Sequence, residues 1–161
     1  MLQQTLPSPL ARISVLPGMV GRVSGILFNH DHLKKTMRHL EVMCEQLERG
    51  AHVPQKPVGP AELLANLQRH LGEHFAAEES QDYFGAMLAQ TPGLSRVISI
   101  LSAEHLNMLR TVSTLQEMAQ DPTRWSHLAT PVRRLIKDFE LHELAETKLL
   151  HELFRAPAVP A

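Results

Sequence analysis

Prolines and glycines divide the chain into a short arm and four long segments, and each long segment repeats its apolar residues at helical spacing. In the first long segment the apolar residues Leu33, Met37, Leu40, Cys44 and Leu47 recur at alternating intervals of four and three. That spacing places them on one face of a helix. The sequence has neither a sustained polar-apolar alternation nor an Asn-Gly or Asp-Gly turn, so β-strands are not expected.

Turn and breaker residues set the limits of the predicted helices, which cover residues 20–49, 60–89, 93–120 and 130–154. The first helix ends at Gly50, the second begins at Pro60, and the next two breaks are "TPG" and "DPT". Long helices with short connections favour antiparallel neighbours. We therefore predict an all-α protein: an irregular N-terminal arm (1–19), an antiparallel up-down-up-down four-helix bundle (20–155) and a Pro-rich tail (156–161).

Charge and cysteine content limit the class of protein. The 161 residues include 16 basic and 17 acidic side chains, so we expect a single bundle domain that binds neither nucleic acid nor membrane. No apolar run approaches the roughly 18 residues that a membrane-spanning helix needs. Cys44 is the sole cysteine, and the first twenty residues lack the apolar core of a secretory signal. We expect a soluble, cytoplasmic protein.

Two His-x3-Glu pairs interrupt the apolar faces of the second and fourth predicted helices. His74 with Glu78, and His142 with Glu146, each lie four residues apart. Residues at that spacing are neighbours on one helix face, and here that face is the apolar one. Both pairs are therefore expected to point into the bundle.

Single histidines occupy the apolar faces of the other two predicted helices. His105 lies on the third, and His30 continues the apolar face of the first, with His32 ranked after it. All four inward histidines lie at comparable depths along their helices, so we predict one layer of four imidazoles and two carboxylates. His70, one turn before His74, is a reserve candidate. The remaining histidines are predicted at the surface or in loops: His39, His52, His127 and His151.

A buried layer with two carboxylates needs positive charge. Each unpaired carboxylate would cost several kcal/mol among aliphatic side chains, and no lysine or arginine lies on these faces near the layer. A pair of metal ions satisfies the layer, because each glutamate can bridge both ions and each imidazole can bind one. The alternative for either pair alone is a hydrogen-bonded core pair without metal. Imidazole and carboxylate ligands favour iron, with manganese as the second choice.

The sequence resembles the hemerythrin-like (HHE cation-binding) family over about residues 24–154, through "HDHL", "HFAAEE", "AEHLNML" and "HELAETKLL" in that order. The resemblance implies a four-helix bundle with two iron ions bridged by an oxo or hydroxo group. By the same resemblance, one iron binds to His30 and His74, the other binds to His105 and His142, and the bridging carboxylates are Glu78 and Glu146.

One position departs from the family pattern. The family usually has His-x3-His on the third helix, and the earlier position in this chain is Leu101. The second iron therefore lacks one ligand. An exogenous ligand, His70 or His32 could take its place, or that metal is weakly held. Tyr83 is not expected to bind metal, because a continuous helix would turn it away from His74.

These patterns predict a di-iron protein that binds or reacts with dioxygen, peroxide or nitric oxide, in oxygen binding, sensing or redox defence. Whether it is an enzyme acting on peroxide or nitric oxide is left open, as are its redox partner and oligomeric state. Two alternatives belong to other classes. One is a metal storage or delivery protein without oxygen chemistry, and the other is a metal-free adaptor or phosphotransfer bundle.

Overall fold

The computed structural model describes residues 19–50 and 59–155, and almost all of this part of the chain is helical. The elements are α2 (Met19–Glu48), α3 (Pro60–Glu78), α4 (Phe84–Gln90), η1 (Pro92–Leu94), α5 (Ser95–Ala119), η2 (Pro122–His127) and α6 (Ala129–Arg155). The all-α prediction is confirmed for these residues. The predicted arm, apart from Met19, and the predicted tail lie outside them. Within the same ranges, no helix is both long and apolar enough to cross a membrane.

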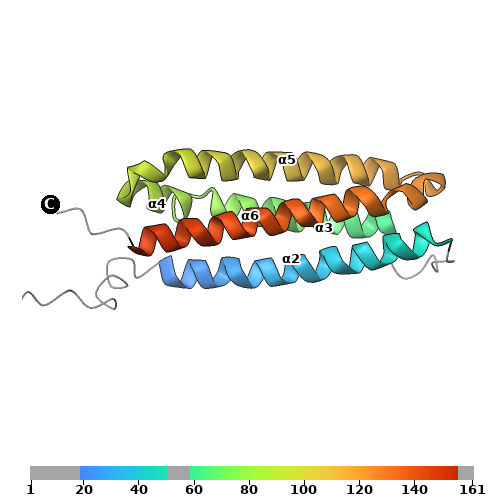
Figure 1. The fold of residues 1–161 in the computed structure, drawn as a ribbon, viewed down its shortest axis with the longest axis horizontal. Coiled ribbons are helices and arrows are strands. Elements are labelled where there is room, and N and C mark those ends of the chain that lie inside the picture. Colours follow the sequence, from blue (N-terminus) through green and yellow to red (C-terminus); the bar gives the residue numbers. More distant parts are fainter. Residues whose placement is uncertain (1–18, 51–58, 156–161) are drawn as a thin grey trace, which may run out of the picture.

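The four long helices α2, α3, α5 and α6 lie side by side, and successive long helices run in opposite directions (Figure 1). Each long helix packs against two others: α2 contacts α3 and α6, while α5 contacts α3 and α6. This arrangement agrees with the predicted antiparallel bundle. The short α4 leads from the end of α3 to the start of α5 (Figure 1).

The second helix is shorter than the sequence predicted. A continuous helix over residues 60–89 was expected, but α3 ends at Glu78 and a five-residue turn precedes α4. In this turn the carbonyl of Ser80 accepts hydrogen bonds from the backbone N–H groups of Tyr83 and Gly85, at 3.2 and 3.1 Å. Serine and aspartate favour such turns because their side chains compete for backbone hydrogen bonds. The expectation of a continuous helix was therefore wrong.

The apolar core consists of two clusters separated along the bundle. The larger cluster includes Leu33, Leu71, Met108 and Phe139. The smaller cluster includes Ile26, Tyr83, Leu101 and Leu149. On α2, α5 and α6 the predicted polar layer falls between these clusters in the sequence: on α2, for example, His30 follows Ile26 and precedes Leu33. On α3 the buried apolar residues belong to the larger cluster, and Glu78 is the last residue of the helix. The core is thus interrupted at one level of the bundle.

Candidate metal centre

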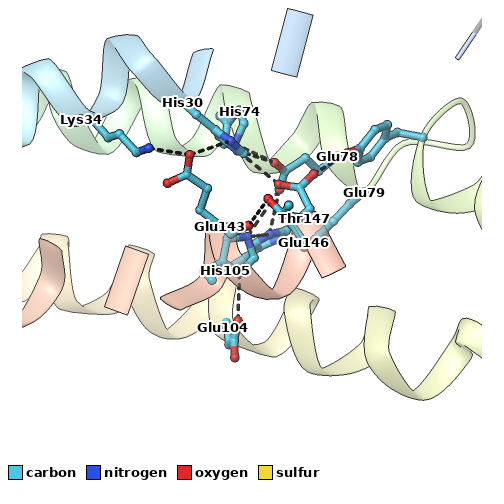
Figure 2. A network of polar contacts seen from close by, with 12 residues as sticks. His30, Lys34, His74, Glu78, Glu79, Glu104, His105, Glu143, Glu146 and Thr147 are labelled. Atoms are coloured by element: carbon cyan, nitrogen blue, oxygen red, sulfur yellow. Dashed lines mark hydrogen bonds and ion pairs between the residues drawn. The ribbon is translucent and has the colours of Figure 1, made fainter. Parts of the chain in front are cut away.

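Six polar side chains are buried in the described part of the chain, and each has at most 2% of its surface exposed. They are His30, His74, Glu78, His105, His142 and Glu146. These are the six residues that the sequence predicted in one layer, and they come from all four long helices. Figure 2 shows side chains from these helices converging on one another.

Glu78 lies at the centre of this layer. Its Oε1 is 2.7 Å from His74 Nε2 and 3.3 Å from His30 Nε2. Its Oε2 is 2.9 Å from His105 Nε2 and 3.8 Å from His142 Nε2. One carboxylate therefore faces two imidazoles with each oxygen. His74 makes no hydrogen bond through either ring nitrogen within the described chain, although its Nε2 is so close to Glu78.

Glu146 has different partners. Its Oε2 lies 3.3 Å from His30 Nε2, and its Oε1 accepts a short hydrogen bond from the Tyr83 hydroxyl. The turn after α3 brings Tyr83 back to the layer, where the side chain is 1% exposed. The prediction that Tyr83 points away from the site assumed a continuous helix and was wrong. The phenol itself is the signal that points to this position, because the hydroxyl of a buried tyrosine needs a hydrogen-bond partner.

Two further glutamates hold imidazoles of the layer from outside. Glu79 Oε1 accepts a hydrogen bond from His105 Nδ1 at 2.7 Å, and Glu104 Oε2 accepts one from His142 Nδ1 at 2.8 Å. Sequence reasoning missed both residues. Glu79 was counted as part of a helix that in fact ends before it, and Glu104 acts across a helix interface that the sequence alone cannot specify.

The protonation of these two imidazoles explains why the layer needs a cation. An ionised carboxylate can only accept, so His105 and His142 must carry a hydrogen on Nδ1. In the neutral rings each Nε2 then presents a lone pair, and these two atoms lie 3.1 Å apart. Glu78 Oε2 adds a third electron-rich atom, 2.9 Å from His105 Nε2. Such a group repels itself unless a proton or a metal ion lies among the three atoms.

Two groups of three residues have the spacing needed to hold an ion. His30, His74 and Glu78 form one group, and Glu78, His105 and His142 form the other. All members of both groups are buried, and the ligand atoms within each group lie within 4.8 Å of one another. Glu78 belongs to both. The residues present therefore fit two neighbouring cations that share one carboxylate.

The two buried carboxylates differ in their affinity for protons. Burial raises the pKa of Glu146, and the negative charge of Glu78 raises it further. Burial acts in the same direction on Glu78, but its close contacts with four imidazoles, led by His105, outweigh it and hold the pKa of Glu78 well below its ordinary range. Burial and the charge of Glu146 raise the pKa of Tyr83, which keeps the phenol protonated as a donor.

His142 carries positive charge more readily than a free histidine does. Burial alone would lower the pKa of its imidazole. The nearby carboxylate of Glu78 and the hydrogen bond to Glu104 outweigh burial, so the net pKa is raised. A proton therefore stabilises the metal-free layer at the place where a metal ion would otherwise do so.

The reserve candidates do not join the layer. His32 is exposed, and its ring packs against that of His70 with centroids 5.1 Å apart. His70 Nε2 lies 2.8 Å from the guanidinium of Arg69, whose positive charge disfavours a cation there. Leu101 is 1% exposed in the same apolar cluster as Tyr83 and offers no ligand atom. His127 is exposed, as predicted.

Comparison with known proteins agrees with this geometry. The model of the hemerythrin HHE cation-binding domain matches residues 23–154, a range that includes all six buried polar residues. Comparisons with curated proteins and with solved structures gave no significant match. The family match covers well over half of the chain. The chain therefore belongs to the hemerythrin HHE cation-binding domain family.

Proposed function

We propose that the chain holds two iron ions in this layer and binds or reacts with dioxygen, peroxide or nitric oxide. One ion would bind to His30 and His74, the other would bind to His105 and His142, and Glu78 would be shared. The observation that carries this proposal is the convergence of three buried electron-pair donors, His105 Nε2, His142 Nε2 and Glu78 Oε2. Nitrogen and oxygen ligands of this kind suit iron or manganese.

The chain's own residues support a site that accepts small ligands. Two ions that share four imidazoles and two carboxylates keep open coordination positions, which iron would use for redox chemistry when bound. Leu101 leaves one such position without a protein ligand. Apolar clusters on both sides of the layer exclude water, and Tyr83 holds a proton on its hydroxyl next to Glu146. A separate redox partner would supply or remove electrons.

Metal content and optical spectra of protein expressed in iron-supplied cells test the proposal. We expect about two iron ions per chain, as the two ligand groups require. We also expect a near-ultraviolet absorption band in the oxidised protein that changes on addition of azide, peroxide or nitric oxide. His74→Ala and Glu146→Ala should reduce the metal content and change the band. His127→Ala is the matched control, since that imidazole is exposed and far from the layer in sequence.

The same measurements separate the two other classes of function. A storage or delivery protein would contain iron but give a spectrum that is insensitive to azide, peroxide and nitric oxide. A metal-free adaptor would contain no iron under any loading condition. The second outcome would remove the basis of the proposal, because the buried carboxylates would then be satisfied by protons alone.

A further inference from the structure

The two ligand groups differ in what lies behind their imidazoles. We call Glu78, His105 and His142 the inner-α5/α6 position, and His30, His74 and Glu78 the inner-α2/α3 position. In the inner-α5/α6 position both imidazoles donate from Nδ1 to a carboxylate, at 2.7 Å to Glu79 and 2.8 Å to Glu104.

Neither imidazole of the inner-α2/α3 position has such a partner. The Nδ1 atoms of His30 and His74 make no hydrogen bond within the described chain. The nearest carboxylate to His30 Nδ1 is that of Glu143, at 3.7 Å, which is too long for a hydrogen bond. Glu143 is instead paired with Lys34, whose Nζ lies 2.6 Å away (Figure 2). The ion pair with Lys34 therefore largely neutralises the negative charge of Glu143.

A carboxylate behind an imidazole strengthens that imidazole as a ligand. It fixes the hydrogen on Nδ1, leaves the Nε2 lone pair free for the metal, and raises the basicity of the ring. Removal of such a partner typically lowers metal affinity by about 10–100-fold. The ring of His105 is also stacked on Phe75, with centroids 4.0 Å apart and planes inclined by 9°, so its orientation is already set.

From this difference we infer that the two metal positions have unequal affinity. The inner-α5/α6 position retains its ion, and the inner-α2/α3 position is the one that exchanges. Glu79 and Glu104 are positioning residues that create the inequality. The inference rests on the proposed function only in requiring that two cations bind, and it holds whichever divalent metal occupies the positions.

Cobalt(II) titration of the full-length metal-free protein, in competition with a chelator, tests the inference through the visible absorption of bound cobalt. We expect two binding steps in the wild type, separated by about 10-fold or more in dissociation constant. The variant with both Glu79→Ala and Glu104→Ala should weaken the tighter step so that the steps merge. Gln at both positions restores the hydrogen bonds without the charge and should recover part of the separation.

Three single variants assign the steps. Glu143→Ala, the control, should leave the tighter step unchanged, because Glu143 makes no hydrogen bond to an imidazole of the layer. His74→Ala should leave the tighter step and remove the weaker one, and His142→Ala should do the reverse. Circular dichroism checks that each variant is folded.

Two results would overturn the inference. The first is two binding steps of equal affinity in the wild type. The second is a tighter step that is lost in His74→Ala and kept in His142→Ala. Either result would show that Glu79 and Glu104 do not determine which position binds metal more tightly. These results would leave the proposed function standing. Absence of any bound cobalt or iron in the folded wild type would instead overturn the proposed function, and the inference with it.

Discussion

The two His-x3-Glu pairs are alike in sequence and differ in their surroundings. His74 and Glu78 form the last turn of α3, whereas His142 and Glu146 lie within α6, which continues to Arg155. Because α3 stops at Glu78, the residues after it can turn back toward the layer. The same spacing therefore produces two carboxylates with different partners.

The difference in partners has an electrostatic consequence. Glu78 faces four imidazoles, which lower the pKa of its carboxyl group against the effect of burial. Glu146 faces one imidazole and the Tyr83 hydroxyl, and burial together with the charge of Glu78 raises its pKa. The metal-free layer thus favours one buried negative charge, at Glu78. Comparison of matched substitutions at these two positions tests this conclusion.

The largest expected effect is on metal binding. Glu78→Gln should lower the affinity for both ions by more than about 100-fold, because Glu78 belongs to both ligand groups. This loss exceeds the one typical of removing a carboxylate that only hydrogen-bonds to a metal-binding imidazole. Glu146→Gln should retain about one ion per chain, in the inner-α5/α6 position. Metal analysis after equilibration with a chelator measures both. Glu73→Gln is the control, since its side chain lies on α3 with 63% exposed. Equal losses in the two layer variants would contradict the comparison.

The second prediction concerns the stability of the metal-free protein at different pH values. Because the folded-state pKa of Glu146 is raised from 4.5, native protein keeps a proton that unfolded protein has lost, and stability falls as pH rises above that value. The shift of Glu78 has the opposite sign. Its charge contributes stability above pH 4.5, and this contribution is lost as pH falls toward its folded-state pKa.

Urea unfolding of metal-free protein at pH 5 and pH 7 measures the slope that Glu146 causes, because Glu78 is largely ionised in both folded and unfolded protein over this range. Glu78→Gln should lower the free energy of unfolding at pH 7 by about 3 kcal/mol, as for a broken buried ion pair. Glu146→Gln should be at least as stable as the wild type at pH 7. Its advantage in free energy of unfolding over the wild type should grow from pH 5 to pH 7. An advantage that shrinks as pH rises would mean that Glu146 is ionised in the folded protein.

The third prediction tests the contact that only the break in α3 makes available. Tyr83→Phe keeps the ring in the smaller apolar cluster but removes the donor to Glu146. A buried acceptor left without its partner costs about 1–3 kcal/mol, so the variant should be destabilised by that amount. A double-mutant cycle with Glu146→Leu isolates the pair, because the cost should disappear when the acceptor is absent. Strict additivity would mean that the hydrogen bond contributes nothing to stability.

The sequence was sufficient for the features that depend on helical periodicity. The all-α class and the burial of both His-x3-Glu pairs follow from spacing within single helices, where residues four apart must share a face. The choice of His30 over His32 follows from the same rule, and the structure buries His30 and exposes His32.

Features that depend on local competition or on contacts between helices were not predictable. Ser80 and Asp82 lower helix propensity without requiring a break, so a continuous helix and a turn differ by a small free energy that tertiary packing decides. The positions of Glu79 and Tyr83 depend on that break. The contact between Glu104 and His142 depends on the rotation of α5 against α6, which no single-helix pattern specifies.

The smallest expected effect concerns the backbone of the two pairs. Two residues before the histidine, α3 has Gly72 where α6 has Glu140. A Cβ added at Gly72 would meet no atom within 4 Å, and its φ angle is not positive. Gly72→Ala should therefore stabilise the protein by about 0.5–1 kcal/mol, because alanine restricts the unfolded chain. Thermal unfolding measures the gain, and Ala76→Gly, at an exposed position of the same helix, should lose a similar amount. Destabilisation by Gly72→Ala would show that α3 needs glycine to bring His74 and Glu78 to the layer, and that the two pairs differ in backbone as well as in partners.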